Sequence, residues 1–563
     1  MKMNKKLSRM AIALLAVSEA GAAHAGTAIP FDNGMTLDWG LDTFYTLASR
    51  VHNPNSLLAG PTNAGGNDGD NNFKKGTFTA NRIGALFTSK LSKGDSGLVM
   101  SGSTFYDAAY HGHNDNPGPI NNPGPVNQFP DQTQRYQGGY TRLLDAYGYT
   151  SFNFGDSSRA TVRLGRHVVS WGEGLFFPSI SLAQGPADGT KIGIPGTVTR
   201  DVLLPEDQLS SVIQVTPKWS LLTQLQYNFH ETLAPSSGSY LNTSDGVGPG
   251  GTCLGPDVTI PAVPGLFKGF SGCSFGVRGN DIKPGRFGQW GIGTRYRVTS
   301  ETEIGLYFLN YNDRTPLPVI NSFTPGTKTP AFFNIAGNQI GNGSYQVRYF
   351  NDVKLLGSTF STTFGAVTLA GELSYKMGAP VLVNTVVNPA TNATVPNPTR
   401  ADITQVNLNA FANLGRSPIA DSVLLLGEIS AIGVNHVQAI QAPGVDALGA
   451  AAAAFPSSDK LTFTNRGIAA QGQIVLGYPG ITPNWDLTVP ISYAQQLKGR
   501  TLTGGVGGQG DKRASFGASF IRNNNLAITF TYLAYLGSPS LDLVHYRALT
   551  DRNQVSVDMK YSF

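Results

Sequence analysis

The chain has 563 residues, of which only 14% are charged, and its formal net charge at pH 7 is +5. The first 25 residues account for +3 of this, because four basic residues there face one Glu, so the rest of the chain carries +2. So small a charge on so long a chain excludes a basic nucleic-acid-binding surface, and the even composition favours one large domain over several soluble ones.

The N-terminal segment has the three parts of a secretory signal. Basic residues come first, an apolar run over 10–17 follows, and a small-residue cleavage motif ends at Ala25. Because this run is far shorter than the roughly 20 residues that a membrane-spanning helix needs, we predict a signal peptide over 1–25, cleaved after Ala25. Later in the chain only 447–455 comes near such a run, and we expect a small loop helix there.

Stretches in which apolar and polar residues alternate recur along the rest of the chain and predict β-strands. The first carries Leu37, Trp39 and Leu41 on one face and Asp38 and Asp42 on the other. The connections between strands are alternately short and long. We expect short turns near 92–95, 155–157, 216–218, 299–300, 362–363, 416–417, 482–484 and 523–524, and long loops over 53–72, 111–140, 231–284, 315–343, 379–401, 439–459, 499–510 and 538–550.

The chain ends on its most regular strand. In the last nine residues one face carries Val555, Val557, Met559, Tyr561 and Phe563, and the residues between them are polar. A transmembrane barrel needs such a strand, because its last strand must pair with its first; the alternative is the terminal strand of a soluble sandwich. The pattern favours an all-β fold, a transmembrane antiparallel β-barrel of about 18 strands (16 is the alternative), with short periplasmic turns and long surface loops.

Four tryptophans support the membrane interpretation. Trp39, Trp219, Trp290 and Trp485 all lie at or near the ends of expected strands. Aromatic side chains at these positions are typical of the two girdles at the membrane–water interfaces. A β-propeller would also alternate strands and turns, but the sequence lacks the repeat of about 40–50 residues that its blades would produce.

If the apolar face of each strand meets lipid, the charged residues between them line the lumen. The strand residues that we expect to face inward are Arg163, Arg295, Arg297, Lys354, Glu372, Lys376 and Glu428, with Asp558 and Lys560. Such charges of both signs either form a salt-bridge lattice that stiffens a wide barrel or create a transverse field at a constriction that selects solutes. The sequence leaves both interpretations open.

Alternation breaks at Trp171, and the residues that follow to about 205 are apolar and rich in Gly and Pro. A polar surface loop does not need this composition. We therefore predict that a segment around 171–205 folds into the lumen, buries Trp171 and narrows the pore; the alternative is a loop packed on its own aromatics outside. Arg166, His167 and Glu173 would supply polar groups. Arg166 and Glu173 would find partners among the inward charges of the wall, such as Arg295, Arg297 or Glu372.

The same region resembles a known family. The run Gly165-Arg166-His167-Val168-Val169-Ser170-Trp171-Gly172-Glu173 is similar to the Gly-Arg-Gln-Val-Val-Ser-Trp-Gly-Glu signature of the bacterial domain-of-unknown-function 1302 family, and Pro195-Gly196, Leu204-Pro205, Tyr227-Asn228-Phe229 and the ending over 551–563 match its continuation. This chain departs at His167, where the family usually has Gln. The resemblance covers nearly the whole mature chain and implies a Gram-negative outer-membrane protein, without a substrate or catalytic residues.

The two cysteines, Cys253 and Cys273, lie close together in a Gly/Pro-rich stretch, and in an exported chain this predicts a disulfide within one loop rather than a metal site. Enzyme motifs are weak. A G-x-S-x-G match at Ser274 lies in that loop, not in the strand–helix turn that the motif needs. A His111–His113 pair near acidic residues suits a solvated loop better than a metal centre. His230 and His436 lie near strand ends without a proposed role.

These observations predict a passive, porin-like channel in the outer membrane of a Gram-negative bacterium, without a cofactor or metal. Few net charges and an apolar inward segment favour small hydrophobic or amphipathic solutes over phosphate or sugars. The expected partners are outer-membrane lipid, the solute and the barrel assembly machinery, and no nucleic acid. The alternative is a barrel-borne lipid hydrolase, which would release fatty acid from phospholipid instead of conducting ions.

Overall fold

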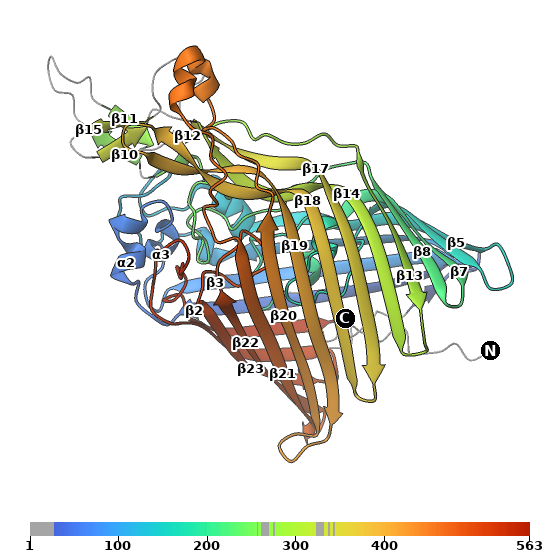
Figure 1. Cartoon of the computed structure of the whole chain (residues 1–563). Helices are drawn as coiled ribbons and strands as arrows, with labels where there is room; N and C mark the ends of the chain where they lie inside the picture. Colours follow the sequence, from blue (N-terminus) through green and yellow to red (C-terminus); the bar gives the residue numbers. More distant parts are fainter. Residues whose placement is uncertain are drawn as a thin grey trace.

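A computed structural model describes residues 28–197, 199–255, 257–260, 270–273, 276–321, 332–335, 338–341 and 344–563. The predicted signal peptide and its cleavage site at Ala25 lie outside the described residues. Figure 1 shows a slanted wall of long strands, with short helices and small hairpins gathered at one end. None of the helices among the described residues is long and apolar enough to cross a membrane.

Eighteen antiparallel strands form a closed barrel, as predicted. Closure is made by the terminal strand β25, which pairs with β2 from Asp42 opposite Ser562 to Arg50 opposite Gln554. The barrel strands in chain order are β2 (Thr36–Arg50), β3 (Phe78–Lys93), β4 (Ser96–Asp107), β5 (Gly139–Asn153), β6 (Arg159–His167), β7 (Glu206–Thr216), β8 (Trp219–Gln226), β13 (Gln289–Arg297), β14 (Thr302–Ile320), β17 (Ser344–Phe364), β18 (Val367–Asn388), β19 (Ala393–Gly415), β20 (Ser422–Asn435), β21 (Arg466–Thr482), β22 (Trp485–Lys498), β23 (Lys512–Arg522), β24 (Leu526–Leu536) and β25 (Gln554–Ser562).

The alternation seen in the sequence becomes the two faces of this wall. On β25 the side chains of Val555, Val557 and Met559 are exposed on the outside, whereas those of Ser556 and Ser562 are buried on the inside. Because strand side chains alternate between faces, the barrel presents an apolar outer surface and a largely polar inner one. Both faces are therefore those expected of a barrel that lipid surrounds.

The connections also alternate as predicted, short at one end of the barrel and long at the other. The long ones carry the short helices α2 (Ser56–Ala59), η1 (Pro61–Asn63), α3 (Asp68–Asn71), η2 (Ala108–Tyr110), α4 (Asp131–Thr133), the π-helical turn η3 (Gln134–Gly138), η4 (Ser181–Ala183), α5 (Thr199–Val202) and η5 (Val445–Ala454). They also carry the short strands β9 (Cys253–Leu254), β10 (Asp257–Ile260), β11 (Phe270–Cys273), β12 (Gly276–Arg278), β15 (Phe332–Ile335) and β16 (Asn338–Gly341). The short strand β1 (Ile29–Pro30) instead precedes β2 and pairs with its first residues. The helix η5 stands where a small loop helix was expected.

One expected loop is wrong. Residues 379–401 are mostly strand, because β18 and β19 continue beyond their neighbours as a long hairpin that turns between Asn388 and Ala393. Its inward side chains, such as Val381 and Val383, are buried, which stabilises the extended conformation. The prolines of this hairpin are tolerated because a hairpin that leaves the main sheet has edges where their missing N–H is not needed.

Candidate functional site

Residues 168–197 and 199–205 leave the wall between β6 and β7 and enter the lumen; we call them the inward segment. Trp171 is buried, and its ring stacks on that of Tyr307 of β14 with 5.8 Å between centroids. It shares an apolar cluster with Ile180 of the same segment and with inner-wall residues that include Val353 and Leu355 of β17. An apolar segment packed on an apolar patch of inner wall removes both from water, which holds the segment inside.

Two carboxylates of the inner wall, Glu372 on β18 and Glu428 on β20, hold the near part of the inward segment. Glu372 Oε1 accepts the backbone N–H groups of Ser179 and Ile180, both at 3.0 Å, and its Oε2 accepts those of Glu173 at 3.0 Å and Gly174 at 3.3 Å. Glu428 accepts those of Leu175 at 3.2 Å, Phe177 at 2.9 Å and Phe176. Backbone groups that a buried, irregular segment would leave unpaired are thus satisfied by charge-assisted hydrogen bonds.

This contact explains the glycine of the signature. Gly172 has φ of 98°, a conformation that side chains other than glycine rarely adopt, and a Cβ there would collide with Glu372 Oε2. The chain can therefore turn over the Glu372 carboxylate only with glycine at this position. The residues Trp171 and Gly172 of the signature act as one unit, which inserts a ring into the wall and lets the backbone approach the carboxylate.

The far part of the inward segment reaches other strands around the lumen. Asp188 pairs with Arg142 of β5 at 2.7 Å and accepts a hydrogen bond from the Tyr140 hydroxyl at 2.8 Å. Further along, the carbonyl of Gly193 accepts a hydrogen bond from Gln554 of β25 at 3.2 Å. Contacts to β18 and β20 at one end and to β5 and β25 at the other mean that the segment crosses the lumen.

Several predicted site residues lie where the inward segment meets the wall. Arg295 Nε donates to the Tyr307 hydroxyl at 3.0 Å and lies 3.9 Å from Glu303 Oε1. Glu173, on the segment and outside the strands, faces Arg295; burial raises the pKa of Glu173 to about 7, against the lowering effect of Arg295 and with a further rise from Glu303 and Glu372. The site therefore contains one carboxyl that titrates near neutral pH.

Three other predicted residues face inward away from this contact. Arg163 is exposed to the lumen, with its guanidinium 5.8 Å from the ring centroid of Tyr147, and Arg297 is half-buried. Lys376 is buried on the same face of β18 as Glu372. His167 is buried as well, with its Nε2 at 2.7 Å from Ser210 Oγ, so its role in this structure is to join β6 to β7 rather than to line the pore.

Lys354 is on the wrong face for the prediction. Its neighbours Val353 and Leu355 face inward, fully buried, so Lys354 points outward with Leu356 and Phe360, both of which are exposed. The apolar inward segment packs on the inner wall at this height, so the inner face of the strand is apolar here. The charged side chain therefore lies on the outer face, the reverse of the usual arrangement. Lys354 therefore does not line the lumen.

Arg166 also differs from the prediction. It lies opposite Asp207 in the β6–β7 ladder, its Nε donates to Asp207 Oδ1 at 3.1 Å, and its Nη2 donates to His230 Nε2 at 2.9 Å. By strand alternation Asp207 shares a face with the exposed Leu209, which is the outer one. The prediction that Arg166 pairs with inward charges of the wall is wrong, because this side chain is held at the rim of the barrel.

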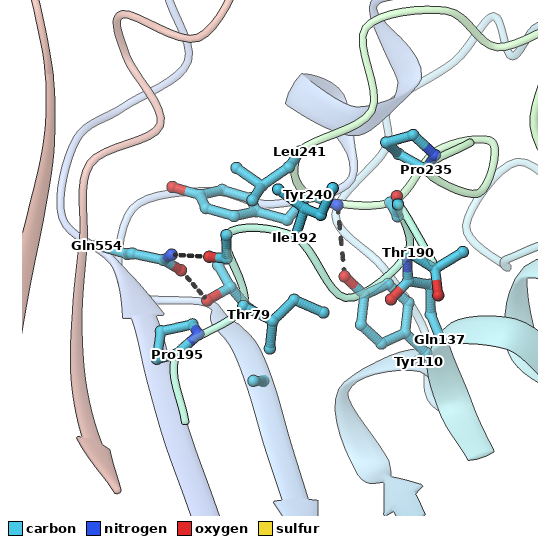
Figure 2. Close-up of a pocket in the computed structure, with 15 residues that line it drawn as sticks. Thr79, Tyr110, Gln137, Thr190, Ile192, Pro195, Pro235, Tyr240, Leu241 and Gln554 are labelled. Carbon is cyan, nitrogen blue, oxygen red and sulfur yellow. Dashed lines mark hydrogen bonds between the residues drawn. The ribbon is translucent and has the colours of Figure 1, made fainter. Parts of the chain in front are cut away.

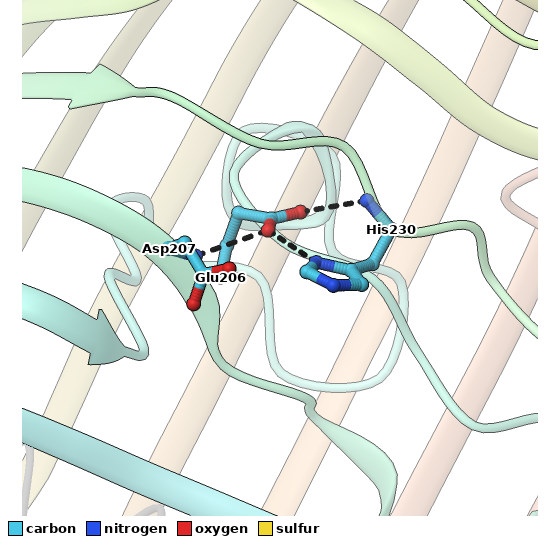
Figure 3. A group of neighbouring side chains, drawn as sticks. All are labelled: Glu206, Asp207 and His230. Atoms are coloured by element: carbon cyan, nitrogen blue, oxygen red, sulfur yellow. Dashed lines mark hydrogen bonds and ion pairs between the residues drawn. The ribbon is translucent and has the colours of Figure 1, made fainter. Parts of the chain in front are cut away.

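Glu206, Asp207 and His230 form a compact group where β7 begins (Figure 3), with ligand-type atoms within 4.8 Å of one another. Both ring nitrogens of His230 are already engaged, Nδ1 with Glu206 Oε1 at 2.6 Å and Nε2 with Arg166. Arg314 adds a second positive charge, 3.5 Å from Glu206 Oε2. Two guanidiniums occupy the positions that a cation would need, so the group suits a salt-bridge network better than a metal site.

Sequence reasoning missed a buried network under the loops. Arg50 and Arg552 both pair with Asp70, at 2.8 Å and 3.2 Å, and all three side chains are fully buried. Arg50 also lies 2.9 Å from Asp551. The network ties the 53–72 loop to the strands that close the barrel. The Asp551-Arg552-Asn553 run in the family-like ending was its only visible signal.

The predicted disulfide is present: Cys253 and Cys273 are bonded, with Cα atoms 5.2 Å apart, and join β9 to β11 within one loop. Of the weak enzyme motifs, Ser274 lies outside the described residues. His111 stacks on Tyr106, and its Nε2 lies 3.0 Å from the Gly138 carbonyl. This histidine is thus used in loop packing.

The model of the family described as "Protein of unknown function (DUF1302)" matches residues 6–563. No curated protein matches the chain. Among solved structures the chain is similar to Acinetobacter baumannii OccAB1 (TM-score 0.43, 10% identity, covering 96% of this chain and 99% of that one), Pseudomonas aeruginosa OccK5 (OpdH) (0.40, 9%, 95% and 99%) and Salmonella typhi OmpF in complex with daunomycin (0.36, 10%, 95% and 100%). The fold itself rests on the strand pairing described above.

Proposed function

We propose, from the premise that this chain belongs to the DUF1302 family of proteins of unknown function, that it is a passive outer-membrane channel for small hydrophobic or amphipathic solutes. The observation that carries the proposal is the combination of a closed barrel, apolar outside, with a lumen that the inward segment crosses. A barrel whose interior serves only for packing does not need buried carboxylates to hold an irregular segment across it.

The inward segment supplies the selective element. Its exposed side chains include the apolar Leu182 and Ile192, while Glu173 and Arg295 bring charges of opposite sign to the place where the segment meets the wall. Opposite charges across a narrow passage create a transverse field, and an apolar surface beside them lowers the cost of passage for a solute with an apolar body. This arrangement favours amphipathic solutes over inorganic phosphate.

The outer-membrane location follows from the same barrel. Exposed apolar side chains on the outside of β25 and its neighbours would be insoluble without lipid around them. Export through a cleaved signal, insertion by the barrel assembly machinery and an environment of outer-membrane lipid are part of the proposal. The long connections would then face the outside of the cell and the short turns the periplasm.

Conductance of the purified protein in planar bilayers tests the channel. We expect discrete, ohmic current steps that do not need an energy source. A folded barrel that inserts but carries no current, in bilayers and in liposome-swelling assays with small amphipathic solutes, would contradict the proposal. Release of fatty acid from the same phospholipid would instead support a barrel-borne hydrolase.

A further inference from the structure

Inside the barrel, side chains fill the space where the inward segment passes under a long loop. Figure 2 shows Gln554 bonded to Thr79, at 3.0 Å, with the rings of Tyr110 and Tyr240 close by. Among the described residues that line this small hollow, none carries a charged side chain. A group of unpaired positive charges lies elsewhere, on the outer face of the wall.

Three cationic side chains make up this group, which we call the basic cluster: Arg348 and Lys354 of β17 and Arg400 of β19. The guanidiniums of Arg348 and Arg400 both lie over the ring of Phe350, with their Cζ atoms 4.8 Å and 5.3 Å from its centroid. Ala401 belongs to the apolar cluster that packs on the inward segment, so the adjacent Arg400 points outward, as Lys354 does. Arg348 shares the ring with Arg400 and therefore lies on the same face.

No acidic side chain neutralises the basic cluster. Among the described residues, no carboxylate forms an ion pair with any of its three members. Asp352 lies nearby on β17, but its Oδ2 accepts a hydrogen bond from Asn351 Nδ2 at 2.5 Å. Asp402 on β19 accepts one from the Tyr375 hydroxyl at 2.8 Å and lies 3.0 Å from His436 Nδ1. The positive charges of the cluster are therefore left for a group outside the protein.

Arg400 is fixed in a position from which it can bind an anion. Its Nη1 donates to the Gly378 carbonyl at 3.0 Å and its Nη2 to Asn351 Oδ1 at 2.9 Å, so the guanidinium is held between β18 and β17. Each of these nitrogens carries a second N–H. Lys354 pairs with β18 at the residue before Gly378, which brings its ammonium to the same place. A fixed guanidinium beside a mobile ammonium suits the oxygens of a phosphate.

The register of the strands places the cluster at one boundary of the apolar outer surface. Lys354 lies opposite Asn310, and Asn310 lies opposite Trp290, whose ring is exposed. Exposed tryptophans of this kind mark the depth of lipid headgroups. From Lys354 to Phe364, at the short-turn end of β17, about ten residues at about 3.3 Å each and a tilt of about 40° give a height of roughly 25 Å. This is the height of the apolar band in such barrels.

We infer that the basic cluster binds the phosphate monoester of a membrane lipid in the leaflet on the long-loop side of the barrel. The inference rests on the membrane location that is part of the proposed function. The acyl chains would lie over Leu356 and Phe360, which are exposed on β17 between the cluster and the short-turn end. A monoester offers three terminal oxygens to the N–H groups of the cluster, whereas the phosphodiester of phosphatidylethanolamine carries its own ammonium as a counter-charge.

The experiment measures lipid binding to the full, delipidated barrel in detergent. Three probes share the same acyl chains: dioleoylphosphatidic acid carries a phosphate monoester, dioleoylphosphatidylethanolamine a diester and dioleoylglycerol no phosphate. We expect phosphatidic acid to bind at least about tenfold more tightly than the other two. Equal affinities would overturn the inference. Displacement of the lipid by an equal concentration of inorganic phosphate would assign the cluster to free anions and overturn the lipid assignment.

Two variants locate the site. Lys354→Gln and Arg348→Gln should each weaken binding of phosphatidic acid by about tenfold, because each removes one positive charge from the phosphate. The matched control is Lys512→Gln, which removes a lysine at the loop end of β23, on the same outer face as the exposed Leu536 opposite it. This control should leave binding unchanged. Heat-modifiable migration confirms that each variant is folded. Equal losses in Lys354→Gln and Lys512→Gln would refute the site.

The outcome separates this inference from the proposed channel. Current steps together with no phosphate-dependent lipid binding would leave the channel standing and remove the site. Phosphate-dependent binding that is lost in Lys354→Gln, in a barrel without conductance, would support the site and remove the channel.

Discussion

Glu372 accepts four backbone N–H groups of the inward segment on a side chain that is only 2% exposed. A carboxylate has two oxygens with about four acceptor positions, so this group is used to capacity. Glu428, which also holds this segment, accepts hydrogen bonds from three more of its backbone N–H groups. The position of the pore-crossing segment thus depends on two side chains of the wall.

Replacing Glu372 by Gln should loosen the segment. The amide keeps one acceptor oxygen and turns a donor NH₂ toward backbone N–H groups, which should weaken the local structure by about 1–3 kcal/mol. We expect faster hydrogen exchange in peptides that cover 173–180 while the barrel strands keep their protection. Glu303→Gln is the control, since Glu303 makes only a 3.9 Å pair with Arg295. Unchanged exchange in Glu372→Gln would show that the carboxylate does not hold the segment.

Glu173 should make the pore's ion preference depend on pH. Burial raises the pKa of this carboxyl to about 7, so it is neutral below that pH and negative above it. Preference for cations, measured as the reversal potential in a salt gradient, should therefore increase as the pH rises through about 7. Glu173→Gln should abolish this step. A step of the same size in Glu173→Gln would assign the titration to another group.

At the scale of elements, the inward segment is the part that can be removed without breaking the ladder. It lies between β6 and β7, which pair with each other directly from Arg159 opposite Gln214 to His167 opposite Glu206. Replacing 175–200 by a short Gly linker should raise single-channel conductance and relax solute selectivity, because the lumen would then be crossed by less protein. The control removes 442–456, the loop around η5, and should not change conductance. Unchanged conductance in a folded 175–200 deletion would place the constriction elsewhere.

The disulfide lies within one loop, and we expect its removal to affect only the structure of that loop. Cys253 and Cys273 close a short loop. Among the described strands, no pairing between barrel strands involves either cysteine. A thiol-reactive label on denatured, unreduced protein should find no free cysteine. Replacing both by Ser should lower the stability of that loop by up to about 3 kcal/mol and leave the heat-modifiable barrel intact. Two free thiols, or loss of the barrel in the double variant, would contradict this assignment.

At the scale of the whole molecule, stability comes from closure. The last residue takes part in it: the Phe563 N–H donates to the Leu41 carbonyl at 3.0 Å, and its ring packs edge-on against that of Tyr561. Deleting Phe563 should lower the amount of folded, heat-modifiable protein in outer membranes, because the closing strand loses both a ladder bond and its terminal aromatic ring. Deleting Ile29 and Pro30, which pair only at the free end of β2, should have little effect. Equal yields from both deletions would contradict a special role for the terminus.

The sequence by itself determined most of the strands, their number to within 16 or 18, the closure and the break at Trp171. These features follow from a period of two residues and from local composition, which are visible without neighbours in space. The tertiary structure decided which groups meet. Lys354 points outward because a segment distant in sequence makes the inner wall apolar there, and Arg166 finds Asp207 and His230 rather than the charges expected. Seven amides converge on Glu372 and Glu428 from more than 190 residues away, and such contacts depend on the path of the chain rather than on any local pattern.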